Sequence, residues 1–284
     1  MRLITYRRDA TTAPALLKGG HVFPLSQLGF SDSLAFICAG PKRWAGVGLQ
    51  LEETGLNLLA PLSSVTLEPP IQRPAKILCI GLNYRDHATE SKMEPPMVPT
   101  VFTKFPHTLI GNGQTILLPR ASQQPDYEAE LAVVIGQGGR NIAEADWEEH
   151  VFGYTILNDV SARDVQLATS QWTLGKNFPT FGPMGPWIVS KDEVPDPHQL
   201  DISLSISGET LQKSNTRELI FKLPQLIAYI SKMMPLAPGD IISTGTPAGV
   251  GMGRTPQRWL KPGDDVVVEI SGIGSLRNPV LAEP

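Results

Sequence analysis

The chain has 284 residues, and 41% of them are hydrophobic, which is enough for one large core or for a small domain beside a larger one. The net charge of −4 and the absence of a long run of Lys and Arg argue against a surface that binds nucleic acid. No segment approaches the roughly 18 uninterrupted apolar residues of a membrane span, and the N-terminal residues do not resemble a signal peptide. With two widely spaced cysteines, we expect a soluble cytoplasmic protein that acts on a small molecule.

The first seventy residues are interpreted as a small α/β domain. A strand is predicted at residues 1–6 and a mostly helical segment at 24–40, with little other regular structure. Three prolines in residues 69–74 cannot continue a helix or a central strand, so the segment 67–74 is the predicted linker. The expected domains are therefore residues 1–70 and residues 71–284.

The second part of the chain is predicted to be rich in strands, which gives an α+β fold class. Proline and glycine number 26 each, and this favours many turns and short elements. A helical pattern covers residues 216–233, with Pro224 either at a kink or at the helix start. Strands are predicted at residues 75–80, 127–135, 151–159, 202–206, 240–244 and 265–270.

Two glutamates in the predicted strand 127–135 form the densest chemical signal. Side chains alternate along a strand, so Glu128 and Glu130 share a face about 7 Å apart. Such pairs are common on solvated sheet edges, and alone this pair favours that simple interpretation. A third carboxylate, Asp159, follows a nearly uncharged strand. Three carboxylates suit Mg²⁺ or Mn²⁺ better than Zn²⁺, which prefers His and Cys.

A histidine and a glutamate follow the predicted strand 75–80. In a helical turn, His87 and Glu90 lie on one face, and the carboxylate can orient the imidazole as a general base that activates water. Taken alone, the spacing favours a surface His–Glu pair on a loop. The proline-rich residues 92–99 resist regular structure and are predicted to form a lid.

Several longer strings resemble the fumarylacetoacetate hydrolase superfamily, in that family's order and across residues 71–284. They are GLNYRDHATE, PDYEAELAVVIG, GYTILNDVSARDVQ, TLGKNFPTFGPMGPW, GDIISTGTPAGVG and GIGSLRNPV. The resemblance implies a mixed β-roll catalytic domain and a homodimer, or sometimes a higher oligomer.

The resemblance also assigns roles to residues of this chain. Lys176 would contact the carboxylate or oxo group of the substrate, although without the resemblance a surface salt bridge is the favoured interpretation. A cation beside three carboxylates offsets their charge and can stabilise an enolate. The implied metal ligands are Glu128, Glu130 and Asp159; the catalytic residues His87, Glu90 and Lys176; and the substrate-binding residues Lys176, Gln166 and Thr246.

Two common catalytic motifs, a P-loop and a serine-hydrolase elbow, are missing from the sequence. The glycine-rich residues 244–253 lack the Gly-Lys-Ser/Thr ending of a P-loop, and we interpret them as a turn that presents backbone N–H groups and Thr246 to an oxo acid. A G-x-S-x-G elbow is absent from the sequence, so a serine-hydrolase mechanism has no support.

The favoured prediction is a hydrolase that uses Mg²⁺ or Mn²⁺. It would cleave a carbon–carbon bond of a 2,4-dioxo acid, such as an acylpyruvate or a diketo-deoxy sugar acid, into a pyruvate-type acid and a carboxylic acid. The alternative is an oxaloacetate tautomerase or decarboxylase, or a 2-oxo-diene-dioate isomerase, on the same metal–enolate site. The strings SNT at residues 214–216 and WLKPGD resemble a subgroup of oxaloacetate tautomerases. A non-catalytic ligand-binding protein is the third hypothesis.

Overall fold

The computed structural model describes residues 1–54, 60–90 and 94–284, and one large sheet runs through most of this chain. In pairing order its strands are β4 (Ala60–Pro61), β3 (His21–Pro24), β2 (Thr11–Lys18), β1 (Arg2–Arg8), β14 (Gly182–Ser190), β12 (Val151–Asn158), β11 (Ala129–Ile135), β17 (Ile241–Ser243), β6 (Ile77–Gly81) and β7 (Thr100–Lys104). Two short strands join it at the side, β5 (Thr66–Glu68) on β1 and β8 (Leu109–Ile110) on β14.

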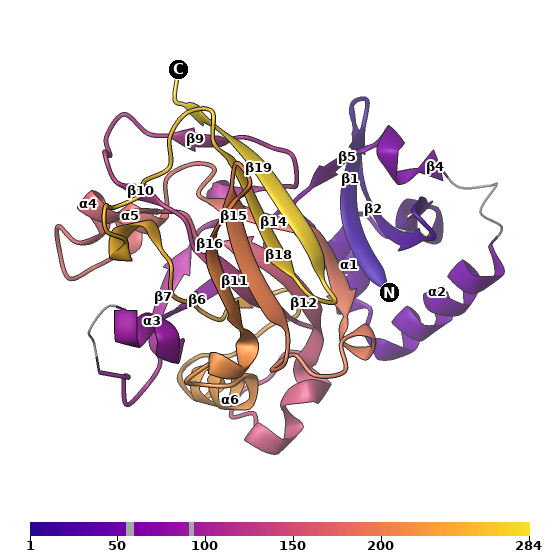
Figure 1. The fold of residues 1–284 in the computed structure, drawn as a ribbon. Coiled ribbons are helices and arrows are strands. Elements are labelled where there is room, and N and C mark those ends of the chain that lie inside the picture. Colours follow the sequence, from indigo (N-terminus) through magenta and orange to yellow (C-terminus); the bar gives the residue numbers. More distant parts are fainter. Residues whose placement is uncertain (55–59, 91–93) are drawn as a thin grey trace.

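A second sheet packs across the first, and Figure 1 shows four of its five strands in orange and yellow and the earlier β9 in purple. Its order is β16 (Glu209–Asn215), β15 (Asp201–Ile206), β18 (Asp265–Ile270), β19 (Gly274–Ala282) and β9 (Ile116–Leu118), and β10 (Pro125–Asp126) pairs separately with β13 (Ser161–Ala162). The helices are α1 (Ser33–Cys38), α2 (Pro41–Glu53), α3 (Arg85–Glu90), α4 (Arg163–Gln166), α5 (Thr173–Lys176) and α6 (Leu223–Met233). Short 3₁₀ turns lie at Leu25–Leu28, Leu62–Ser64, Pro106–Thr108, Glu144–His150, Lys191–Glu193, Thr216–Glu218 and Gly251–Gly253. The predicted strand-rich α+β class is confirmed.

Strand β11 is buried on both faces, and its alternation divides the core in two. Leu131, Val133 and Ile135 point toward the second sheet, where they join one apolar cluster. Ala132 and Val134 point the other way and join a cluster that includes side chains of α1 and α2. Glu130 therefore lies on a strand that the core holds rigidly, and Glu128 directly precedes that strand.

The N-terminal segment is joined to the rest by main-chain pairing. Strand β1 pairs antiparallel with β14, and Leu3 lies opposite Ile188. The predicted linker is also hydrogen-bonded to this segment, because the Thr5 hydroxyl donates to the Pro70 carbonyl at 2.8 Å. A single sheet therefore crosses residue 70, and the division into domains there stays a prediction.

The expectation of little regular structure around the first helix was wrong. Strands β2 and β3 and the 13-residue helix α2 are also present. Pro14 stands inside β2 and weakened the strand pattern, although this strand pairs on both sides. Gly46 and Gly48 lowered the helical signal of α2, which is stabilised instead by burial of Trp44, Val47 and Leu51.

The later elements follow the predicted order with shifted ends. The predicted helix 216–233 is a 3₁₀ turn followed by α6, and Pro224 lies in the first turn of α6, so it marks a helix start rather than a kink. For the predicted lid, residues 92 and 93 lie outside the described residues. Residues 94–99 have no regular secondary structure, and Met97 is 96% exposed.

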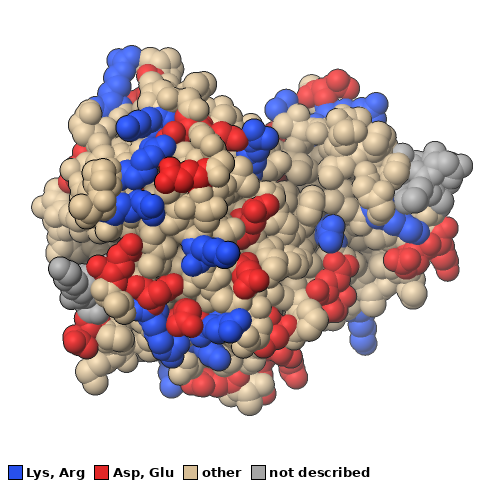
Figure 2. Space-filling model, in the orientation of Figure 1, with Lys and Arg blue, Asp and Glu red and all other residues tan. Residues whose placement is uncertain are grey.

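The surface drawn in Figure 2 mixes charges of both signs. Lysines and arginines alternate with acidic residues on this face, so it presents no single-sign field of the kind that polyanions require. Among the described helices, none is both long and apolar enough to cross a membrane.

Candidate metal and oxo-acid site

The three predicted metal-ligating carboxylates meet at the ends of two paired strands. Glu128 directly precedes β11, Glu130 is its second residue, and Asp159 directly follows β12. These strands are antiparallel with Ala129 opposite Asn158, which brings all three side chains to one end of the sheet. Oxygen atoms of the three carboxylates lie within 4.8 Å of one another, and all three residues are buried. The solvated sheet edge considered above is therefore excluded.

Three buried cations contact this carboxylate group, namely Lys176, Lys104 and Arg163. The Lys176 ammonium donates to Glu128 and to Asp159, both at 2.7 Å. Lys104 donates to the other oxygen of Asp159 at 2.7 Å and also to the backbone carbonyls of Val160 and Lys176. Lys176 is thus buried within the site, which excludes the surface salt bridge that sequence reasoning left open.

Lys104 is a functional candidate that sequence reasoning missed. It ends strand β7, where Ile77 of β6 lies opposite it, and it is only 1% exposed. A lysine at the end of a strand is usually exposed, and its partner Asp159 lies 55 residues away in the chain. The sequence offered little signal, because Lys104 ends the mixed segment Thr100–Lys104, which contains only two apolar residues.

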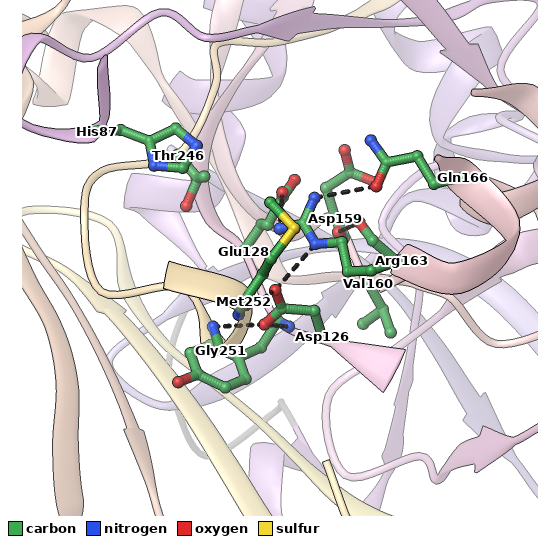
Figure 3. Close-up of polar contacts among 12 residues, drawn as sticks. His87, Asp126, Glu128, Asp159, Val160, Arg163, Gln166, Thr246, Gly251 and Met252 are labelled. Carbon is green, nitrogen blue, oxygen red and sulfur yellow. Dashed lines mark hydrogen bonds and ion pairs between the residues drawn. The ribbon is translucent and has the colours of Figure 1, made fainter. Parts of the chain in front are cut away.

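Asp126 and Arg163 connect the glycine-rich segment to the site (Figure 3). Arg163 donates to Asp126 at 2.9 Å and to Glu128 at 2.5 Å. Asp126 also accepts from the backbone N–H groups of Gly251 at 2.7 Å and Met252 at 3.0 Å. Gly251 has no room for a side chain, because an added Cβ would lie 2.0 Å from the Arg258 carbonyl oxygen. The turn is therefore held against the carboxylates by backbone groups.

The charges of Glu128 and Glu130 are balanced differently. Burial alone would raise the pKa of Glu128, but the charges of Arg163 and Lys176 outweigh burial and hold this pKa at about 2. The pKa of Glu130 is raised well above its usual range by burial and by the charges of Asp159 and Glu128. Glu130 accepts from the Ser243 hydroxyl at 2.5 Å and from the Gly245 N–H at 3.0 Å, and both donors are neutral.

This arrangement fits a divalent cation. Among the described residues, four buried carboxylates face three buried cations, namely Asp126, Glu128, Glu130 and Asp159 against Lys104, Arg163 and Lys176. One negative charge is left over, and Glu130 is the carboxylate of the four whose hydrogen bonds come from neutral donors, Ser243 and Gly245. An all-oxygen ligand set with uncompensated charge suits Mg²⁺ or Mn²⁺.

The His87–Glu90 pair has the predicted geometry. Both residues lie on α3, and His87 Nδ1 is 3.3 Å from Glu90 Oε2. The Gly249 N–H contacts both carboxylate oxygens of Glu90, at 3.0 and 3.1 Å. Burial alone would raise the pKa of Glu90, but hydrogen bonds from His87 and Gly249 lower it, so the carboxylate stays charged beside the imidazole. His87 is 9% exposed, which excludes a freely solvated surface pair.

A cavity of about 470 Å³ joins the histidine pair to the carboxylates. Gln166 and Thr246 line it as predicted, and Gln166 accepts a hydrogen bond from Arg163 at 3.0 Å. Figure 3 draws His87 and Thr246 on one side of the site and Gln166 on the other. The remaining wall is mainly apolar and includes Leu82, Phe102, Leu167, Trp172, Val250 and Met252.

The family model "Fumarylacetoacetate (FAA) hydrolase C-terminal" matches residues 76–281, which contain every one of these site residues. The chain belongs to the fumarylacetoacetate hydrolase family. The predicted superfamily is thereby confirmed. The prediction that the chain is an enzyme of this family is confirmed as well.

Relatives within the family differ in their reactions. A Xenopus laevis protein named mitochondrial oxaloacetate tautomerase fahd2 is 41% identical over 290 residues, covering 99% of this chain and 90% of its own length. The fumarylacetoacetate hydrolase of Exiguobacterium antarcticum has a TM-score of 0.87 at 34% identity, with both chains fully covered. The maleylpyruvate hydrolase of Sphingobium sp. SYK-6, solved with manganese(II) and pyruvate, has a TM-score of 0.83 at 30% identity, again with full coverage.

Proposed function

We propose that this chain is a divalent-metal-dependent oxaloacetate tautomerase, which interconverts the keto and enol forms of a 2-oxo dicarboxylic acid. The similarity to a named oxaloacetate tautomerase over 99% of the chain carries this choice of reaction. The site supports this choice, because a histidine shares one cavity with a carboxylate group that has one cation fewer than it has carboxylates. The hydrolase favoured from the sequence becomes the second candidate.

Glu128, Glu130 and Asp159 would hold the metal, with Mg²⁺ and Mn²⁺ as the proposed ions. When bound, such an ion supplies positive charge that polarises a 2-oxo group and favours its enolate form. Lys176 would add a second positive charge beside the same oxygen atoms. Its ammonium is already held by Glu128 and Asp159, so it is oriented before a ligand arrives.

His87 is proposed to move the proton. With Nδ1–H donating to Glu90, the neutral imidazole keeps Nε2 as its basic atom. Nε2 would take a proton from C3 of oxaloacetate, and the resulting imidazolium, stabilised by Glu90, would return a proton to the oxygen at C2. The proton balance closes without water, because one C–H bond is broken and one O–H bond is formed.

Hydrolysis of a 2,4-dioxo acid is the second candidate, and the same His87–Glu90 pair favours it. A histidine that can take a proton from carbon can also take one from water, and Glu90 stabilises the imidazolium in both cases. The structurally similar maleylpyruvate hydrolase was solved with manganese and pyruvate, a product of the type that such cleavage releases. Decarboxylation and 2-oxo-diene isomerisation are further reactions open to one enolate site.

Product analysis separates these reactions. The protein loaded with Mn²⁺ or Mg²⁺ is mixed with oxaloacetate, an acylpyruvate or a diketo-deoxy sugar acid. We expect faster loss of the ultraviolet absorbance of enol-oxaloacetate, without CO₂ or new acids. The control is an equal metal concentration with Glu128→Gln protein, because free metal also catalyses enolisation. Release of two acids from the acylpyruvate, with no acceleration on oxaloacetate, would overturn the tautomerase proposal in favour of the hydrolase.

Location and assembly remain proposals. The Xenopus laevis relative is named as mitochondrial, so the cytoplasmic location expected from the sequence stays a prediction. The homodimer stays a prediction too, and light scattering of the purified chain measures it directly.

A further inference from the structure

Thr246 receives its hydrogen bond from a residue of the second sheet. Thr246 lines the cavity and is 4% exposed. Its hydroxyl oxygen accepts from Nε2 of Gln212 at 2.8 Å. Gln212 lies on β16, is fully buried and lies outside the cavity wall, so it reaches the ligand only through Thr246.

The orientation of the Gln212 amide is fixed by two backbone groups. Its Oε1 faces the Ala129 N–H at 3.0 Å, and this group can only donate. Its Nε2 faces the Pro247 carbonyl at 2.8 Å, and this group can only accept. A flipped amide would place oxygen against oxygen and two N–H groups against each other, so Nε2 must be the atom that faces Thr246.

The fixed amide determines the polarity of the Thr246 hydroxyl. Because Nε2 is the donor, the hydroxyl oxygen is the acceptor, and its own hydrogen remains free to donate elsewhere. Within residues 1–54, 60–90 and 94–284 this hydroxyl donates to no protein group, and Thr246 borders the cavity. The cavity side of Thr246 therefore offers a proton and suits a ligand atom that accepts one.

We propose that Gln212 is a positioning residue that makes Thr246 an obligate hydrogen-bond donor to an anionic carboxylate oxygen of the oxo acid. This inference rests on the proposed function in that the ligand is an oxo acid. It also explains why Gln212 spans the two sheets. Its amide contacts Ala129, between Glu128 and Glu130, so one side chain links the strand that carries the carboxylates to the donor at the ligand.

Oxalate binding to the Mn²⁺-loaded protein, measured by calorimetry, tests the proposal without turnover. Thr246→Val should weaken oxalate binding about tenfold or more, as expected for a lost hydrogen bond to a charged group. Gln212→Met, which keeps the side-chain length, should weaken it similarly and leave Mn²⁺ affinity unchanged. Thr246→Ser should restore binding. The matched control is Lys213→Met, a change at the adjacent exposed residue of β16, which should leave oxalate binding at the wild-type value.

A double-mutant cycle separates positioning from general structural damage. If Gln212 acts through Thr246, Gln212→Met should cost oxalate little further affinity in the Thr246→Val background. A full additional loss there, or wild-type binding by Gln212→Met, would overturn the proposal. Should Gln212→Met not fold, Gln212→Glu takes its place. It keeps the acceptor for Ala129, but its carboxylate captures the Thr246 proton, so oxalate binding should again fall.

The outcome for the proposed function is separate. Wild-type protein that fails to bind oxalate would overturn the inference about Thr246. Wild-type protein that binds oxalate in a Gln212-dependent manner but does not tautomerise oxaloacetate would leave the inference standing and sink the tautomerase assignment.

Discussion

The two glutamates of the site differ in what surrounds them, although only one residue separates them. Glu128 is held by Arg163 and Lys176, while Glu130 is held by the neutral donors Ser243 and Gly245. The pKa of Glu128 falls to about 2, and that of Glu130 rises well above its usual range. The negative charge of Glu128 is thus balanced by two cationic side chains of the protein. Glu130 has no such cationic hydrogen-bond donor among the described residues. The difference favours Glu130 as the carboxylate whose charge the proposed cation would balance.

Replacing each glutamate in turn should have the largest effects on metal affinity and on stability. Glu128→Gln and Glu130→Gln should each weaken Mn²⁺ binding more than about 100-fold, because even residues that only support a metal ligand cost 10–100-fold. The metal-free proteins should diverge. Glu128→Gln leaves Arg163 and Lys176 short of a partner and should lower the free energy of unfolding by about 3–5 kcal/mol. Glu130→Gln replaces a carboxyl group whose raised pKa already favours its neutral form, so it should not lower the free energy of unfolding. Calorimetry and urea unfolding measure both, and equal destabilisation would contradict the comparison.

His87 lies outside the carboxylate group, and its loss should affect chemistry alone. His87→Ala should lower kcat for the proposed tautomerisation by about 10²–10⁴-fold, as expected for a general acid–base residue. Mn²⁺ affinity should stay at the wild-type value. The matched control is His107→Ala, because His107 is exposed and lies outside the cavity wall. Tautomerase activity that survives His87→Ala would assign the proton transfer to another group.

Replacing Lys104 tests whether the buried carboxylates depend on buried cations for stability. Lys104→Met should lower the free energy of unfolding by about 3–5 kcal/mol, since Asp159 loses one buried partner. Lys76→Met is the control, because Lys76 makes a pair of the same 2.7 Å length with Asp240 but is partly exposed. It should cost less in denaturant unfolding, and equal losses would show that burial of Lys104 has no special effect.

The pH dependence should follow Glu130. The raised pKa favours its protonated form in the metal-free fold, so this contribution to stability is present at low pH and is lost as pH rises through the raised pKa. Metal binding must displace that proton. Mn²⁺ affinity should therefore fall about tenfold per pH unit below the raised pKa. Calorimetry in buffers of different ionisation enthalpy should detect the released proton, and Glu130→Gln should abolish its release.

Sequence patterns picked out the candidate residues, but they did not decide their roles. Alternation placed Glu128 and Glu130 on one face, helical spacing paired His87 with Glu90, and Asp159 followed an apolar strand. Taken alone, the glutamate pair favoured a solvated sheet edge, and the roles of Lys176, Gln166 and Thr246 came only from the family resemblance. Lys104 and Gln212 were missed because their partners are distant in sequence, with 83 residues separating Ala129 from Gln212. The N-terminal fold was also incompletely predicted, because β2 contains a proline and α2 contains two glycines, and tertiary packing outweighs both.

The apolar wall of the cavity has a consequence for how such an enzyme can change. The carboxylates lie on strands in the centre of the fold, whereas Leu167 and Trp172 lie in the connection between α4 and α5. Leu167 is 57% exposed and so is weakly constrained by packing. Mutations in this connection can reshape the far end of the cavity while the proposed metal ligands stay in place. Evolution can therefore alter which ligand the cavity accepts without rebuilding the group of carboxylates.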